Sequence, residues 1–306
     1  MKKVLLAVLL AAMVAAACSS DASETPDNGA DETASGATFP VEVAGATIES
    51  QPERIVSLST VSTEVLFAIG AGDQVIAVDS QSNYPTDAPV TELSSFEPNV
   101  EAIAEFEPDL VFTSFDPGDL VSGLDTLGIP VIVHPTAISI DDAYGQIEQV
   151  GVATGRVGEA AALVASMQSD FDSLIAAVPD VDEAPTYFHE LDNTFFSTTS
   201  ATFIGEIYGL AGMVNIADPA DPDGFGYPQL SEEYILDENP DFVFLADTLY
   251  GESIETVAAR PGWGELDAVQ QDRVVELDSD TASRWGPRMV DFYADVVGAL
   301  EAAYVG

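Results

Sequence analysis

Histidine and cysteine have the most specific chemistry among the side chains of this chain, and both are scarce. His134 and His189 are the only histidines, and they lie in different halves of the 306-residue sequence. A zinc or manganese site needs several histidine and carboxylate ligands at one place. A single histidine after a strand is more often a satisfied polar residue than a ligand. The sequence therefore predicts no metal site.

Motifs of nucleophilic catalysis and phosphate binding are also missing. The chain contains no G-x-S-x-G nucleophile motif and no G-x-x-x-x-G-K phosphate loop. It has 53 Asp and Glu residues, so neighbouring acids are too common to mark a catalytic pair. We predict that the protein is not an enzyme and needs no cofactor.

The N-terminus has the order of an export signal. A positive Met-Lys-Lys start is followed by an apolar run to residue 14, which is too short to span a bilayer. Three alanines then precede Cys18, the only cysteine, so no intramolecular disulfide can form. We interpret residues 1–17 as a bacterial lipoprotein signal peptide and Cys18 as the residue that is acylated after cleavage. Plain secretion is the alternative.

The segment after Cys18 is small, polar and acidic as far as Thr38. Such a segment has nothing to bury and is typical of a flexible tether, here residues 18–38. A tether behind a lipid-bearing cysteine suits a domain that stands off a membrane. We therefore expect the protein to be anchored on the outer face of the bacterial cytoplasmic membrane.

Acidic residues outnumber basic ones, 53 against 8, and the formal net charge is −45. Lys2 and Lys3 belong to the predicted signal peptide, so the mature chain has no lysine and six arginines. Nucleic-acid binding is excluded, because phosphates need a basic surface, and attraction of an acidic substrate is disfavoured. The chain has no D-x-[DN]-x-[DN]-G calcium loop. We interpret the charge as a solvated surface suited to a salty exterior, where self-repulsion is screened.

A long amphipathic helix is predicted near the middle of the chain, at residues 159–178. Its apolar residues recur at intervals of four, four, three and four, namely Leu163, Met167, Phe171, Leu174 and Val178. The helix opens with Glu159, an acid favoured at the positive end of the helix dipole, and it stops at Pro179. At about 1.5 Å per residue it is roughly 30 Å long, which is the width of a small domain.

A motif before this helix recurs after it. The segments VEAIAEFEPDLVF (100–112) and EEYILDENPDFVF (232–244) both read E-x-I-x-acid-x-x-P-D-x-V-F, so Glu101 matches Glu233. Each predicts a short helix, a proline that ends it and a buried strand. One repetition at long spacing predicts two similar lobes. Chance repetition of a common helix–proline–strand junction is the alternative.

Strands and helices alternate on both sides of the long helix, which predicts parallel sheets covered by helices on both faces. The predicted fold class is α/β, with an N-terminal lobe (39–157), a bridging helix (158–178) and a C-terminal lobe (179–306). Ligands of such open sheets bind beyond the carboxyl ends of the strands. These ends are predicted at residues 57–59, 113–116, 189–192, 247–250 and 278–285.

Six segments in one order carry a resemblance to a known family. They are RIVSLSTVSTEVLFAIGAG, NVEAIAEFEPDLVF, the mid-chain helix, FIGEIYGLAGMVNIAD, YPQLSEEYILDENPDFVFLAD and SRWGPRMVDFY. Across essentially all of residues 39–306 the chain resembles the solute-binding lipoproteins of ABC importers for vitamin B12, iron-siderophores and related metal chelates. The resemblance implies two α/β lobes bridged by one long helix, with the ligand in a shallow cleft between them. This agrees with the fold predicted from the residues.

The resemblance also implies positions for ligand contacts. In the vitamin B12 branch, aromatic residues line the cleft at the positions of Phe96, Phe196 and Tyr227, where the first and last are usually tryptophan. Asp280 and Arg284 match an Asp and an Arg that this branch places near the ligand.

Two further residues, Phe115 and His189, lie at predicted strand ends and are candidates to face the same ligand. For each aromatic candidate, a place in the core is the alternative.

The repeated glutamates have a separate implied role. In the family that the chain resembles, a surface glutamate at the matching place on each lobe meets arginines of the paired permease subunits. Glu101 and Glu233 are therefore predicted to dock the protein on its transporter. The alternative is that both are helix-start carboxylates favoured by the dipole.

Taken together, the resemblance implies an extracytoplasmic, monomeric substrate-binding component. It would capture a corrinoid or a ferric siderophore and deliver it to an ABC permease dimer with its ATPase. The few arginines argue against catecholate chelates and haem propionates, which need cationic partners. Aromatic walls suit a corrin and a neutral hydroxamate chelate equally. The alternatives are a surface enzyme or adhesin that reuses the fold, and a receptor for haem or a metal ion.

Overall fold

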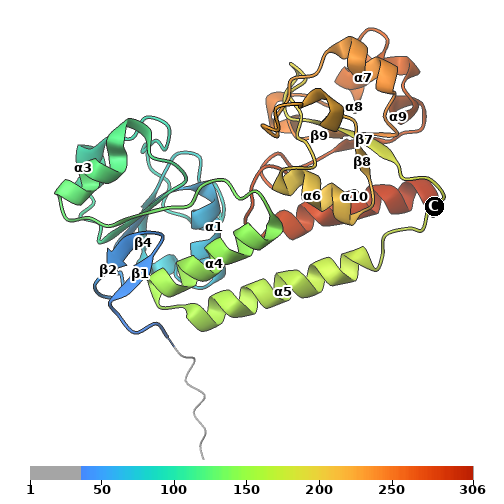
Figure 1. Ribbon diagram of the computed structural model, residues 1–306. Coiled ribbons are helices and arrows are strands. Elements are labelled where there is room, and N and C mark those ends of the chain that lie inside the picture. Colours follow the sequence, from blue (N-terminus) through green and yellow to red (C-terminus); the bar gives the residue numbers. More distant parts are fainter. Residues whose placement is uncertain (1–35, 306) are drawn as a thin grey trace, which may run out of the picture. The chain divides into compact units, whose positions relative to one another are not determined.

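Residues 36–305 are described by the computed structural model of the chain (Figure 1). The predicted signal peptide, Cys18 and most of the predicted tether lie outside these residues. Within the described part, no helix is both long and apolar enough to cross a membrane.

The first lobe is built around four parallel strands. Its elements in chain order are β1 (Val41–Val43), β2 (Ala46–Ile48), β3 (Ile55–Leu58), α1 (Thr60–Ala68), β4 (Val75–Val78), α2 (Val100–Ala104), β5 (Leu110–Thr113), α3 (Leu120–Thr126), β6 (Val131–Val133) and α4 (Ile140–Thr154). The strands of the sheet lie in the order β4-β3-β5-β6, and β1 and β2 form a separate antiparallel hairpin.

The second lobe follows α5 (Val157–Ile175) and has its own four-stranded parallel sheet. Its elements are β7 (Thr186–Glu190), α6 (Phe203–Leu210), β8 (Val214–Asn215), α7 (Glu232–Glu238), β9 (Phe242–Leu245), the 3₁₀ turn η4 (Thr248–Tyr250), α8 (Ile254–Ala258), α9 (Asp267–Gln270), β10 (Val274–Glu276) and α10 (Met289–Tyr304). The strands lie in the order β10-β9-β7-β8.

The two sheets share one topology. When the strands of each sheet are numbered along the chain, they lie side by side as second, first, third and fourth. In this correspondence α1 matches α6, α2 matches α7 and α4 matches α10, because each pair follows equivalent strands. The two similar lobes predicted from the repeated motif are therefore confirmed.

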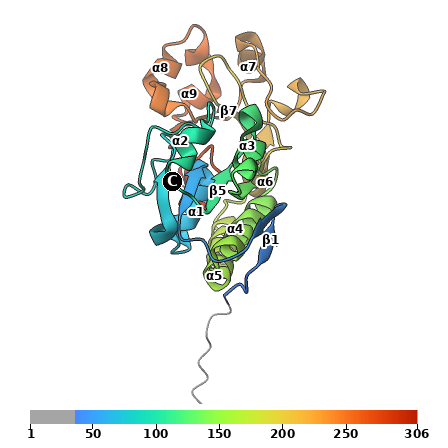
Figure 2. The ribbon, with the colours of Figure 1, turned by 90° about the vertical axis from the view of Figure 1, so that its left-hand side faces the viewer.

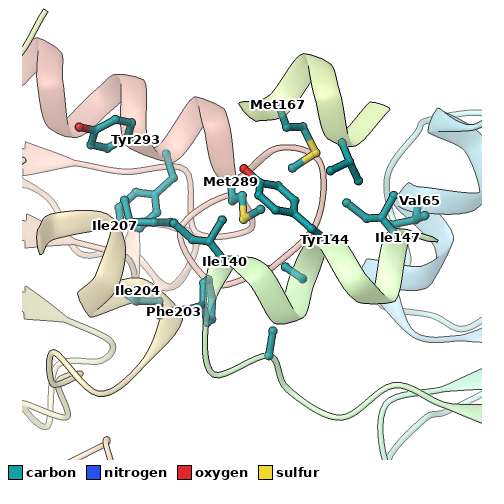
Figure 3. Packing of buried hydrophobic residues seen from close by; sticks show 14 of the residues in the cluster. Val65, Ile140, Tyr144, Ile147, Met167, Phe203, Ile204, Ile207, Met289 and Tyr293 are labelled. Atoms are coloured by element: carbon teal, nitrogen blue, oxygen red, sulfur yellow. The ribbon is translucent and has the colours of Figure 1, made fainter. Parts of the chain in front are cut away.

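Alternating side chains of the central strands enter two different cores. In β5, Leu110 and Phe112 belong to one apolar cluster and Val111 to another, and β9 repeats this division. The clusters around Val111 and its counterpart Val243 each stay within one lobe. The remaining cluster is shared, because it extends through α4, α5 and α10 into both lobes (Figure 3). The lobes are therefore joined by a continuous apolar core.

Helices α4 and α5 form a close pair that supports this shared core (Figures 1 and 2). The turn between them uses Gly155, whose φ of 74° lies in the left-handed region that glycine tolerates. A Cβ on Gly151 of α4 would lie 2.4 Å from the Cβ of Ala160 on α5, so only glycine allows this approach. Close contact between the helices thus depends on small residues.

The predicted long helix is confirmed, but its limits and buried row differ from the prediction. It begins at Val157, two residues before the predicted start. It ends at Ile175, and the chain turns there before it reaches Pro179. Its buried residues are Ala160, Val164, Met167 and Phe171. Of the predicted stripe, Leu163, Leu174 and Val178 are only half-buried. The buried row is shifted because small residues of α5 face α4.

Candidate functional site

The carboxyl ends of β3 and β5 carry hydroxyl groups that fix the loops beyond them. The Ser114 hydroxyl donates to Ser59 Oγ at 2.9 Å, and the Thr113 hydroxyl donates to the Phe115 carbonyl at 2.9 Å. Phe115 is 38% exposed and Phe96 is 69% exposed, with 5.6 Å between their ring centroids. The first lobe therefore presents two neighbouring aromatic rings at the carboxyl edge of its sheet. Neither Phe96 nor Phe115 lies in the core, which was the alternative for each.

The second lobe holds Phe196 and Tyr227 on two segments that pair through their backbones. The Ser197 amide donates to the Pro228 carbonyl, and Phe196 bridges to Gln229 in antiparallel fashion. Phe196 is 38% exposed and Tyr227 41% exposed, and partial burial raises the pKa of the Tyr227 hydroxyl. The structure thus presents a second exposed pair of aromatic side chains from neighbouring segments.

The backbone that carries Tyr227 needs a glycine and an aspartate. Gly226 has φ of 86°, and a Cβ there would lie 2.9 Å from Thr202 Cγ2. The Asp221 carboxylate accepts the amides of Phe225 and Gly226 at 3.0 and 2.6 Å, which fixes the turn before Tyr227. The loop therefore holds its shape independently of the Tyr227 ring.

Three exposed apolar residues near these edges were not among the candidates. Leu249 and Tyr250 of η4, after β9, are 69% and 82% exposed, and Phe225 is 80% exposed. The sequence did place residues 247–250 at a strand end. An apolar pair directly after the third strand of the second lobe is the signal that could have identified Leu249 and Tyr250.

His189 does not have the position expected for a ligand contact. Its side chain is fully buried, its Nδ1 lies 2.9 Å from the Tyr208 hydroxyl, and burial lowers its pKa to about 3. The prediction that His189 faces a ligand is therefore corrected: the last residues of β7 point into the core. His134 is also buried, and its Nε2 lies 3.1 Å from Gln149 Oε1. In the part of the chain that the structure describes, no three His, Cys, Asp or Glu side chains are placed to hold a metal ion.

Asp280 and Arg284 do meet, but within a larger ionic cluster. Arg284 is 9% exposed and donates to Asp280 Oδ1 at 2.6 Å, to Glu64 Oε1 at 2.9 Å and to Asn83 Oδ1 at 2.9 Å. Glu64 and Asn83 belong to the first lobe. The guanidinium therefore joins the two lobes.

All six arginines are occupied by other groups of the chain. Arg54 donates to the carbonyls of Phe106 and Glu107, Arg156 pairs with Glu159, Arg260 with Glu190 and Glu252, Arg273 with Asp241, and Arg284 and Arg288 with Glu64. The described residues contain no lysine. An anionic ligand would therefore meet no unpaired cation on residues 36–305.

Two buried acidic groups of the second lobe are Glu190, the last residue of β7, and Asp247, which directly precedes η4. Glu190 is fully buried and binds Arg260 with both oxygens; burial raises the pKa of Glu190, against the opposing effect of Arg260. Asp247 is 1% exposed, and neither of its oxygens has a hydrogen-bond partner among the described residues. Burial, with Glu190 nearby, raises the pKa of Asp247 to about 7. This part of the site disfavours further negative charge.

Two α/β lobes of one topology, a bridging helix and aromatic groups at the carboxyl edges are the arrangement of a two-lobed binding protein. Sequence comparison agrees with this class. The periplasmic binding protein family matches residues 55–281, and the chain belongs to this family.

Individual relatives and structures are similar over most of their length. An ABC transporter substrate-binding lipoprotein of Bacillus subtilis is 31% identical over 299 residues, which cover 93% of this chain and 92% of the relative. A cobalamin-binding protein of Halobacterium salinarum is 31% identical over 277 residues, 86% of this chain and 74% of the relative. A crystal structure described as a possible iron-binding periplasmic protein of Staphylococcus epidermidis matches at 26% identity with a TM-score of 0.71, covering 82% of this chain and 99% of that chain.

Proposed function

We propose that this protein is the extracytoplasmic substrate-binding component of an ABC importer and that it captures a metal chelate without net negative charge. The observation that carries the ligand class is the arrangement at the carboxyl edges. Phe96, Phe115, Phe196 and Tyr227 expose aromatic surface there, while every described arginine is already paired. Aromatic rings pack on large apolar ligand surfaces, whereas carboxylates and catecholates need cations.

Membership of the periplasmic binding protein family and the names of the relatives support the transport role. The cobalamin-binding relative supports a corrinoid, and a neutral hydroxamate siderophore fits the same chemistry. Asp280 remains a candidate ligand contact, since its side chain is 26% exposed. Arg284 remains a candidate only if it exchanges one of its partners within the protein for the ligand.

Equilibrium dialysis against single ligands tests this function. The panel is cyanocobalamin, a neutral ferric hydroxamate, a ferric catecholate and haem, with the metal-free hydroxamate as the matched control. We expect saturable binding of one of the first two, no comparable binding of the last two, and recovery of the bound ligand unchanged by mass spectrometry. Preferential binding of haem or the catecholate contradicts the ligand class. Chemical conversion of the ligand contradicts the binding role and favours a surface enzyme.

We further propose that Cys18 carries the lipid anchor, with residues 19–38 as the tether. The lipoprotein name of the Bacillus relative supports this assignment. One acyl chain binds a membrane only marginally, so stable anchoring needs two or more. Cys18→Ala should move the protein from the membrane fraction to the soluble fraction. Retention of that variant in the membrane would contradict the assignment.

A further inference from the structure

Helices α1 and α6 occupy equivalent places in the two lobes and share a sequence pattern. Each contains a glutamate followed by Val or Ile, and a glycine with positive φ lies beyond the end of the helix, six residues after the glutamate. The segments are Glu64 to Gly70 and Glu206 to Gly212. Glu64 and Glu206 are therefore corresponding residues of the repeated lobes, although nothing in the Pro-Asp motif pointed to them.

Glu64 contacts the start of the last helix of the other lobe. Glu64 is 2% exposed, and its carboxylate accepts from Arg284 Nη1 at 2.9 Å, Arg288 Nε at 2.9 Å and Arg288 Nη2 at 2.6 Å. Arg288 directly precedes α10, which follows the last strand of the second lobe. A glutamate of the first lobe thus fixes the N-terminus of α10.

Glu206 makes the reciprocal contact. Its Oε2 accepts the amide of Ile140, the first residue of α4, at 2.7 Å. Helix α4 follows the last strand of the first lobe and is the counterpart of α10. The first amides of a helix lack partners within the helix and carry partial positive charge, so a carboxylate is well suited to bind there. Each lobe therefore binds the start of the last helix of the other lobe.

These contacts continue to the edges that carry the candidate ligand site. Arg284 also binds Asn83 and Asp280, and the Asn83 amide donates to Asp280 Oδ2 at 2.8 Å. Asn83 follows β4 and Asp280 follows β10, so this link joins the carboxyl edges of both sheets. Ile140 and Met289, the first residues of α4 and α10, lie in the shared apolar core beside Tyr144 (Figure 3).

We infer that Glu64 and Glu206 are positioning residues of the ligand site. By binding the helix starts of the opposite lobes, this glutamate pair fixes the spacing of the two aromatic edges. The ligand part of this inference rests on the proposed function, whereas the spacing can be measured without a ligand. The two members differ in chemistry. Glu64 holds two guanidinium groups and needs its charge, whereas Glu206 accepts one backbone N–H, which a neutral amide oxygen can also accept.

The spacing is measured by double electron–electron resonance on the full chain. Spin labels at Asp125→Cys on α3 and Glu255→Cys on α8, both exposed positions, report the distance between the lobes in a Cys18→Ala background. The variants are Glu64→Gln, Glu206→Gln and Glu206→Leu. Glu159→Gln is the matched control, because it removes only the ion pair with Arg156 at the start of α5.

We expect Glu64→Gln and Glu206→Leu to broaden the distance distribution, and Glu206→Gln and Glu159→Gln to leave it as in the wild type. If about one chain in ten keeps the competent spacing, apparent ligand affinity falls about ten-fold in the two broadened variants. Circular dichroism confirms that each variant is folded. If Glu64→Gln does not fold, Arg288→Gln replaces it, since it removes the two bonds from that side.

A wild-type distance distribution in both Glu64→Gln, or its replacement, and Glu206→Leu overturns the inference. Equal broadening by Glu206→Gln and Glu206→Leu overturns the role given to the Glu206 oxygen. Failure of the wild type to bind any chelate refutes the proposed function, while the distance measurements still decide the positioning role.

Discussion

Asp247 is a buried carboxyl group whose two oxygens lack hydrogen-bond partners among the described residues. Burial raises its pKa from 3.8 to about 7, so the folded protein holds a proton that the unfolded chain releases at much lower pH. The stability from this group is fully present below about pH 4 and is lost as the pH rises through 7. The contribution of Asp247 therefore makes the folded second lobe less stable in alkaline than in acidic solution.

Asp247→Asn should remove this pH dependence. The amide resembles the protonated carboxyl group, so the stability advantage of the variant over the wild type should be larger at pH 8 than at pH 5 by about 2–4 kcal/mol. Thermal unfolding at both pH values measures the difference. Asp125→Asn, at an exposed position, serves as the control. An equal difference between variant and wild type at pH 5 and pH 8 would show that Asp247 is ionised throughout.

Tyr227→Ala should weaken ligand binding without unfolding the lobe. The loop shape depends on Gly226 and Asp221, and removal of a binding-site aromatic anchor typically costs about 2 kcal/mol, or roughly 30-fold in affinity. Dialysis and thermal unfolding measure the two effects. Tyr304→Ala is the matched control, since Tyr304 is 39% exposed at the end of α10. Loss of stability with unchanged affinity would place Tyr227 in a structural role.

Sequence alone could place candidates at strand ends but could not decide which way their side chains point. Phe115 and His189 were both placed there, yet one is exposed and the other is fully buried. The direction depends on the pleat of the strand and on partners such as Tyr208, which lies 19 residues away from His189 along the chain. For the same reason, the sequence did not reveal that Arg284, which the family resemblance places near a ligand, binds Glu64 and Asn83 about 200 residues away along the chain.

At the scale of elements, α6 contains two glycines that differ in the space around them: one has no room for a Cβ atom and the other has room. A Cβ on Gly205 would lie 2.2 Å from the Thr199 carbonyl oxygen, whereas a Cβ on Gly209 would meet nothing within 4 Å. Gly205→Ala should therefore destabilise the protein by about 1–3 kcal/mol, because the clash is with backbone. Gly209→Ala should stabilise it by about 0.5–1 kcal/mol, since alanine is the better helix former. Chemical denaturation measures both, and equal effects would contradict the close approach.

The long or strongly patterned elements could be predicted from the sequence, and the short ones could not. The buried strands β3, β5, β7 and β9 and the helix α5 lie close to their predicted positions. The hairpin of β1 and β2, strand β8 and helices α8 and α9 are at most five residues long. Elements of this length have no complete hydrophobic period, so tertiary packing decides whether they form.

At the scale of the whole molecule, Glu101 and Glu233 are exposed in the first turns of the equivalent helices α2 and α7. We propose that both dock on the permease, so that the repeated lobes of the receptor match a twofold transporter. Exposed ion pairs contribute only about 0–1 kcal/mol each, so the two would set orientation more than affinity.

Glu101→Arg with Glu233→Arg should therefore keep ligand affinity near the wild-type value but abolish uptake and stimulation of the transporter's ATPase. Asn99 and Ser231 still cap the two helices, so the fold should be retained. Asp170→Arg with Glu301→Arg introduces the same charge change on α5 and α10 and should leave transport intact. Full transport by the Glu101 and Glu233 double variant would remove these residues from the interface.

The two-lobed plan followed from one repeated motif, but the exchange of contacts between the lobes did not. The motif lies on α2 and α7, which pack on the apolar clusters that stay within one lobe. The contacts between the lobes instead involve α1, α4, α6 and α10. Glutamates are so frequent in this chain that no single one stands out. Only the structure shows that Glu64 and Glu206 each bind a residue of the opposite lobe.

The ion pair between Glu64 and Arg288 joins residues that are 224 positions apart, and this separation has a consequence for biosynthesis. When the first lobe has been translated, Glu64 has neither of its guanidinium partners, and a buried carboxylate without a partner is strongly unfavourable. Contacts between residues so distant along the chain also form late. The first lobe should therefore remain incompletely folded until the C-terminal helix has been made. A polypeptide whose folding is delayed in this way remains unfolded enough to pass through an export channel.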